Sequence, residues 1–61
     1  MKKKKLEAML KKVEQASICI DKNLEKESLK DWFGNNTNKL REAQRCMDVV
    51  CALIHEIEVS E

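Results

Sequence analysis

Apolar residues recur at steps of three and four along the second half of the chain. This spacing places them on one side of an α-helix in a heptad-like pattern, whereas a β-strand would need alternating apolar and polar residues. No glycine or proline interrupts the segment. The pattern predicts a helix over about residues 38–59. Its apolar stripe consists of Leu40, Ala43, Met47, Val50, Ile54 and Ile57.

The same segment carries more apolar surface than one stripe can use. Only Asp48 is polar between Cys46 and Ile54. A second apolar row beside the stripe consists of Cys46, Val49 and Leu53. A helix that is apolar over more than half of its circumference is buried on more than one side. We expect the second row to dock on a partner chain; the alternative is that the other helix lies askew and covers it.

The first half of the chain shows the same periodicity. Its stripe consists of Leu6, Met9 or Leu10, Val13, Ala16, Ile20 and Leu24. Ile18, Leu29 and Trp32 lie off this stripe. On one continuous helix they would point within about 60° of one another, because each residue advances the helix by about 100°. We expect these three residues to form a second, sparser row that also contacts a partner.

The segment Gly34–Asn38 predicts the break between two helices. Glycine favours a left-handed C-cap, so the first helix is expected over about residues 3–33 and the turn over residues 34–37. Candidate N-caps of the second helix are Asn36, Thr37 and Asn38. Ser28 and Asp31 also fit the cap of a separate short turn, which leaves the continuity of the first helix through Ser28 open.

A short loop between two amphipathic helices predicts an all-α fold, an antiparallel two-helix hairpin of coiled-coil type over residues 1–61. A chain this short buries only about 60% of the surface that its unfolded form exposes. We therefore expect a partner chain or dimerisation to complete the fold. The expected hairpin core consists of Leu6, Val13, Ile20, Leu24, Leu40, Met47, Val50, Ile54 and Ile57, and the expected partner-binding residues are Ile18, Leu29, Trp32, Cys46, Val49 and Leu53.

Charged residues make up 38% of the chain but nearly cancel, to a formal net charge of +1. General affinity for nucleic acid is therefore not expected, although Lys2–Lys5 forms a local basic run. Glu7 and the following lysines interrupt the apolar segment that a signal peptide would need after this run. The longest apolar run, Val49–Ile54, is too short to span a bilayer. Three cysteines without paired spacing indicate reduced thiols, so a cytoplasmic location is expected.

Cys51 and His55 are four residues apart, so they share a helix face and could supply two metal ligands. A closed zinc site needs four ligands, and the chain has one histidine and no CxxC spacing. A cysteine–histidine catalytic pair would also need an orienting group and a loop that forms an oxyanion hole. We therefore expect no enzyme activity, no bound metal and no cofactor.

The segment Arg45–Ile57 resembles the corresponding region of the smallest cytoplasmic co-chaperone of type III secretion needle proteins, the E-component family of the needle chaperone complex. Members of that family are short helical hairpins with a glycine in the turn, as at Gly34. Their apolar stretch ends near a polar residue or histidine, as in Leu53-Ile54-His55. The resemblance implies a virulence-associated chaperone that pairs with a larger helical-repeat co-chaperone. Together they would hold a needle subunit soluble in the cytoplasm.

Two other functions fit the same pattern. Two hairpins could form a homodimeric four-helix bundle, a small regulator whose paired Lys2–Lys5 runs bind RNA or DNA. The hairpin could also be a small inhibitor that docks on an enzyme. Both the inhibitor and the co-chaperone would bind as a helix laid in a groove, so the sequence does not separate them.

Overall fold

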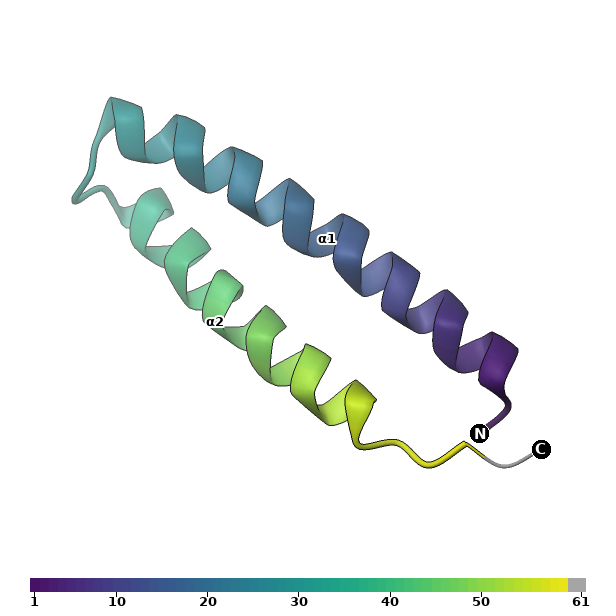
Figure 1. The fold of residues 1–61 in the computed structure, drawn as a ribbon. Helices are drawn as coiled ribbons and strands as arrows, with labels where there is room; N and C mark the ends of the chain where they lie inside the picture. The colour runs from purple at the N-terminus through teal and green to yellow at the C-terminus, as the bar shows by residue number, and fades with distance from the viewer. Residues whose placement is uncertain (60–61) are drawn as a thin grey trace.

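The computed structural model describes residues 1–59 and consists of two antiparallel helices, α1 (Lys3–Lys30) and α2 (Asn35–His55), as Figure 1 shows. The turn lies at one end of the molecule, and Met1 and Glu58 lie together at the other, where the Met1 amino group donates to the carbonyl of Glu58 at 3.3 Å. The molecule measures 48 × 15 × 10 Å. It is therefore a rod that is two helices wide and one helix thick, and the prediction of an all-α helical hairpin is confirmed.

The side of each helix that packs against the other helix is called its seam. The seam of α1 follows the predicted stripe. Leu6, Val13, Ile20 and Leu24 are all half-buried, and the steps between them keep these side chains on one side of α1. The helix is continuous through Ser28, whose hydroxyl donates to the carbonyl of Glu25 at 2.9 Å. The alternative of a separate short turn at Ser28 is therefore wrong.

The seam of α2 is rotated from the predicted one. Its buried and half-buried residues include Thr37, Leu40, Gln44, Met47, Cys51 and Ile54. Val50 is 37% exposed, so its assignment to the hairpin core is wrong. The cause lies partly in Gln44, whose Nε2 donates to Asp21 Oδ1 at 2.8 Å across the two helices. This bond draws Gln44 toward α1 and turns Val50 toward the edge of the interface.

Both ends of α2 differ from the expected ones. The helix begins at Asn35 instead of residue 38, and Gly34 is its N-cap, so the candidate caps lie inside the first turn. It ends at His55 instead of residue 59, where the N–H of Ile57 donates to the carbonyl of Ile54 at 3.1 Å. Ile57 is half-buried just after this end.

The connection spans residues 31–34, because α1 ends at Lys30 instead of residue 33. Asp31 stops α1: its backbone is extended and its side chain accepts a hydrogen bond from the N–H of Phe33 at 3.2 Å. Gly34 has a φ of −64°, so the predicted left-handed C-cap is wrong. Glycine suits the site by close approach instead, since a Cβ at Gly34 would lie only 3.1 Å from Asp31 Cγ.

Thr37 joins the start of α2 to the end of α1. Its hydroxyl donates to the carbonyl of Asp31 at 2.8 Å, and the residue is only 1% exposed. We expect Thr37→Val to lower the free energy of unfolding by about 1 kcal/mol, because the shape is kept but the hydrogen bond is lost. Thermal melts followed by circular dichroism measure this change.

The matched control is Ser28→Ala, which deletes a hydroxyl that bonds only within α1. This variant should melt no lower than the wild type, since alanine is the better helix former. A Thr37→Val variant that melts at or above the wild-type temperature would contradict a stabilising role of the Thr37 hydroxyl.

Candidate protein-docking surface

The hairpin leaves more large apolar side chains outside than inside. Ile54, at 6% exposed, is the one buried apolar residue in the described part of the chain. The exposed large apolar residues are Met1, Ile18, Leu29, Trp32, Phe33, Val49, Val50, Leu53 and Val59. Contiguous exposed apolar surface on a small domain marks a site of contact with another molecule. The docking surface is therefore sought among these residues.

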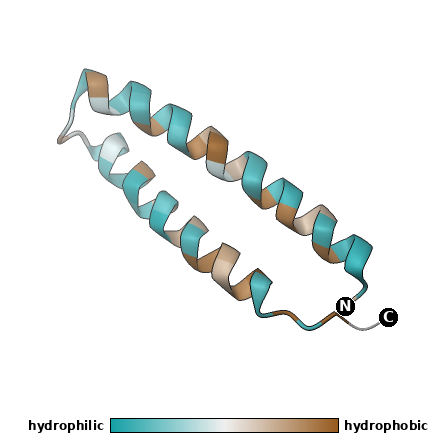
Figure 2. Ribbon diagram, in the orientation of Figure 1, coloured by the Kyte–Doolittle hydropathy of each residue, from teal (hydrophilic) through white to brown (hydrophobic). Residues whose placement is uncertain are grey.

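Cys46, Val49, Val50 and Leu53 form one surface, which we name the α2 apolar patch. Val49 and Leu53 are 59% and 57% exposed, and Cys46 is exposed as well. Helical rotation places all four side chains within an arc of about 100°. A shallow hollow in this surface is lined by Arg45, Cys46, Val49 and Val50. In Figure 2 the half of α2 nearer the termini is largely brown, and the half nearer the turn is more hydrophilic.

The predicted row on the first helix has a different arrangement. Ile18 and Leu29 are exposed on α1, but Trp32 lies in the turn beyond the end of α1, so the three do not form one helical row. The Trp32 ring packs against Arg41, whose Cζ lies 4.4 Å from the ring centroid. Arg41 Nη2 is buried without a hydrogen-bond partner, and its position by the aromatic ring accounts for this.

The two predicted rows do not combine into one surface. In an antiparallel pair, side chains that are rotated from the two seams in the same sense, each followed along its own helix, lie on the same flank of the hairpin. Ile18 is turned from the α1 seam in the same sense as Arg41 is turned from the α2 seam, and the α2 apolar patch is turned in the opposite sense. The structure therefore places Ile18 and Leu29 on one flank and the patch on the other. Partner binding by these residues stays a prediction.

The flank that holds most of the α2 apolar patch also contains lysines of α1, and we name it the apolar–basic flank. It consists of Lys5, Met9, Lys12, Ala16 and Cys19 on α1 and of Ala43, Cys46, Val50 and Leu53 on α2. The opposite flank, which we name the acidic flank, consists of Glu7, Glu14, Ile18 and Asp21 on α1 and of Arg41, Asp48 and His55 on α2.

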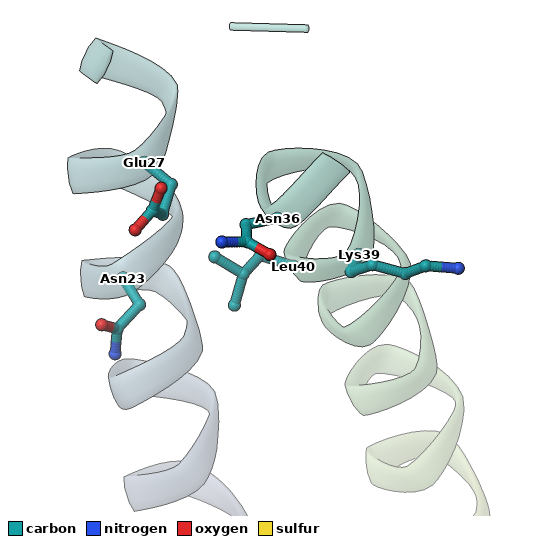
Figure 3. A pocket seen from close by; sticks show the side chains of 5 residues that line it. All are labelled: Asn23, Glu27, Asn36, Lys39 and Leu40. Carbon is teal, nitrogen blue, oxygen red and sulfur yellow. The ribbon is translucent and has the colours of Figure 1, made fainter. Parts of the chain in front are cut away.

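A hollow near the turn shows how the two helices pair along the first of these flanks. Asn23 and Glu27 come from α1, and Asn36, Lys39 and Leu40 come from α2, as Figure 3 shows. Leu40 points toward α1, whereas the Lys39 side chain points away from it. The Glu27 carboxylate lies 3.9 Å from the ammonium of Lys30, so its charge is already paired. Most residues that line this hollow have polar side chains, and the α2 apolar patch lies farther from the turn.

The chemistry of the hairpin offers little beyond these surfaces. Cys51 is half-buried in the seam and His55 is exposed in the last turn of α2. Over residues 1–59 there is no group of three or more histidine, cysteine, aspartate or glutamate side chains that could hold a metal ion. Neither α1 nor α2, the two helices described, has an apolar stretch long enough to cross a membrane. The α2 apolar patch is therefore the main candidate functional site.

Sequence reasoning placed Cys46, Val49 and Leu53 on a docking row but missed Val50 and the basic residues beside it. The signal was present, because Lys5 and Lys12 are seven residues apart and so share a helix face. That this face borders the patch could be recognised only once the rotation of α1 against α2 was known.

Comparisons of the chain with protein-family models, with curated proteins and with solved structures find no match. The docking surface described above is therefore the basis for the function proposed below.

Proposed function

We propose that this chain is a protein-binding adaptor, or co-chaperone subunit, that docks on a larger helical partner. The observation that carries the proposal is the contrast in burial between two neighbouring residues. Ile54 is 6% exposed, whereas Leu53, with the rest of the α2 apolar patch around it, is 57% exposed. A hairpin one helix thick cannot cover both sides of α2, so a second protein supplies the missing cover.

The area involved is large for so small a chain. Three side chains of the size of Cys46, Val49 and Leu53 bury roughly 250–300 Å² when fully covered. About half of that area is still exposed, which corresponds to about 3 kcal/mol of hydrophobic free energy that a partner could recover. This amount is comparable to the whole stability of many domains of this length.

The specific form of the proposal is a co-chaperone for a type III secretion needle subunit in the bacterial cytoplasm. It is supported by the resemblance of Arg45–Ile57, a segment that contains the whole α2 apolar patch. In this form, the hairpin lays α2 against a groove of a helical-repeat co-chaperone. The pair then keeps a self-assembling helical subunit soluble.

Photo-cross-linking tests the docking proposal. A photoreactive benzoylphenylalanine at Val49 is expected to cross-link to a distinct protein in the source cells, because Val49 lies within the α2 apolar patch. The same residue at Lys22, which is exposed on α1, is the control and should give no such product. The specific form further predicts that the product contains a helical-repeat protein and that a small needle-like protein accompanies it.

The oligomeric state of the isolated chain distinguishes the adaptor from the homodimer. Size-exclusion chromatography with light scattering is expected to show a monomer, and the same sample should melt over a broad temperature range. A dimer with a sharp, cooperative melt would contradict the adaptor proposal, because self-association would then cover the α2 apolar patch.

A further inference from the structure

Charge is distributed unevenly between the two flanks of the hairpin, although the whole chain has a net charge of only +1. The acidic flank holds the carboxylates of Glu7, Glu14, Asp21 and Asp48. The apolar–basic flank holds the ammonium groups of Lys5 and Lys12 in the half nearer the termini. Its carboxylate, Glu27, lies near the turn and 3.9 Å from the ammonium of Lys30. A partner that approaches the α2 apolar patch therefore meets positive charge on the α1 side.

The outer border of the patch is basic as well. Arg45 lines the same shallow hollow as Cys46, Val49 and Val50. The nearest carboxylates along α2 lie at the two ends of the patch. Glu42, toward the turn, lies 4.0 Å from the ammonium of Lys39, and Glu56 follows the end of α2. The patch is thus bordered by cations along both of its long sides.

The shape of the flank suits a third helix. Ala16 of α1 and Ala43 of α2 are half-buried on this flank, and their small side chains let another backbone approach closely. The bulkier Met9 and Val50 lie farther from the turn. From Cys46 to Leu53 the patch extends about 10 Å, or two helical turns, along α2. A helix laid beside both α1 and α2 would complete a three-helix bundle.

We propose that the apolar–basic flank binds an amphipathic helix of another protein whose apolar stripe is bordered by glutamate or aspartate. This inference rests on the proposed adaptor function and specifies the chemistry of the partner. Apolar contact with Val50 and Leu53 supplies most of the affinity. Attraction between partner carboxylates and Lys5 and Lys12 selects the partner and speeds its encounter.

A second copy of the chain is a poorer occupant of this flank. In a two-fold dimer the same surface patch of each copy meets the other, so the lysines of both copies gather on one narrow face. A lipid surface is also poorer, because the two aromatic residues, Trp32 and Phe33, lie in the turn and away from this flank.

Two synthetic peptides serve as probes for the inference. Both are amphipathic helices with the same leucine stripe and a fluorescein label; one has glutamates and the other has lysines beside the stripe. Fluorescence anisotropy against the full chain should show the glutamate peptide binding at least about ten-fold tighter at low salt. The preference should shrink as salt is raised to about 1 M, where the Debye length falls to about 3 Å.

The residues responsible are tested with a matched pair of double variants. Lys5→Glu with Lys12→Glu should reverse the preference between the two peptides. Lys4→Glu with Lys11→Glu makes the same change in charge one residue earlier on α1, away from this flank, and should change neither affinity by more than about two-fold. Circular dichroism of both variants checks that their helicity is equal.

Several outcomes would overturn the inference. Equal effects of the two double variants would show that net charge, not the flank, selects the probe. Binding of the full chain to vesicles with anionic headgroups, lost in both Lys5→Glu with Lys12→Glu and Leu53→Asp, would identify the flank as a membrane surface. If Leu53→Asp weakens both peptides while the lysine variants have no effect, the acidic border is wrong but the adaptor function stands. If Leu53→Asp weakens neither peptide, the docking surface fails together with the inference.

Discussion

Replacing Ile54 by aspartate is expected to unfold the hairpin. Ile54 is the most deeply buried apolar side chain of the described chain, at 6% exposed, and it lies in the last turn of α2 against α1. A charge placed there without a partner costs several kcal/mol. A domain of this length rarely has more than about 3–5 kcal/mol of stability, so the cost exceeds what the fold can bear. Far-UV circular dichroism should therefore show little helix at room temperature.

Two controls separate the loss of the core from a general effect of substitution. Ile54→Val keeps an apolar side chain and should lower the free energy of unfolding by about 0.5–1.5 kcal/mol. Val50→Asp introduces the same charge at a position that is 37% exposed, so the helical signal should persist. An Ile54→Asp variant that keeps the wild-type melt would show that this end of the hairpin contributes little to stability.

The second large effect is expected at the neighbouring residue, where Leu53→Asp should abolish partner binding without melting the hairpin. Leu53 is 57% exposed and about 100° around α2 from Ile54, so its charge stays in water in the free chain. In the complex the same charge would be buried in apolar surroundings. A central interface residue typically contributes at least about 2 kcal/mol, so affinity should fall about 30-fold or more. The photo-cross-link from Val49 measures this loss.

Ala52→Asp is the matched control for this substitution. Ala52 is exposed and adjacent to Leu53, but it is turned toward the acidic flank. It should leave the cross-link intact, and both variants should keep the helicity of the wild type. A Leu53→Asp variant that melts like Ile54→Asp would mean that α2 does not have separate core and docking faces.

The sequence predicted the two helices and the seam of α1, because apolar spacing determines which side of an isolated helix is buried. It did not determine the seam of α2. Leu40, Met47 and Ile54 fit two stripes equally, one through Ala43 and Val50 and one through Gln44 and Cys51. The bond between Gln44 and Asp21 favours the second stripe, and such a contact between residues far apart in the sequence leaves no trace in local periodicity.

The turn was misread for a related reason. Glycine after a helix suggests a left-handed cap, but Asp31 ends α1 first through its own side chain. Gly34 then avoids a close contact with the Asp31 side chain, and its φ is not unusual. Single-residue preferences describe the local chain and not the contacts that decide between two acceptable turns.

The division into two flanks could be read from the sequence only after the seam was known. Each lysine and glutamate of α1 has a fixed place around the helix, but the direction that faces α2 determines whether a charge borders the patch. A rotation by one residue would have moved Lys12 away from the apolar–basic flank and brought Lys11 toward it. The candidate site therefore depends on a quantity, the rotation of each helix, that only the packed structure shows.

The separation of bonded residues along the chain grows steadily from the turn to the termini. The bond between Asp31 and Thr37 spans six residues, that between Asp21 and Gln44 spans 23, and that from the Met1 amino group to the Glu58 carbonyl spans 57. Loop-closure entropy rises with the logarithm of this span, so we expect contacts near the turn to form before those at the other end of the hairpin. The α2 apolar patch lies in the half farther from the turn, which we expect to close last. A partner that covers the patch would also hold this half of the hairpin closed.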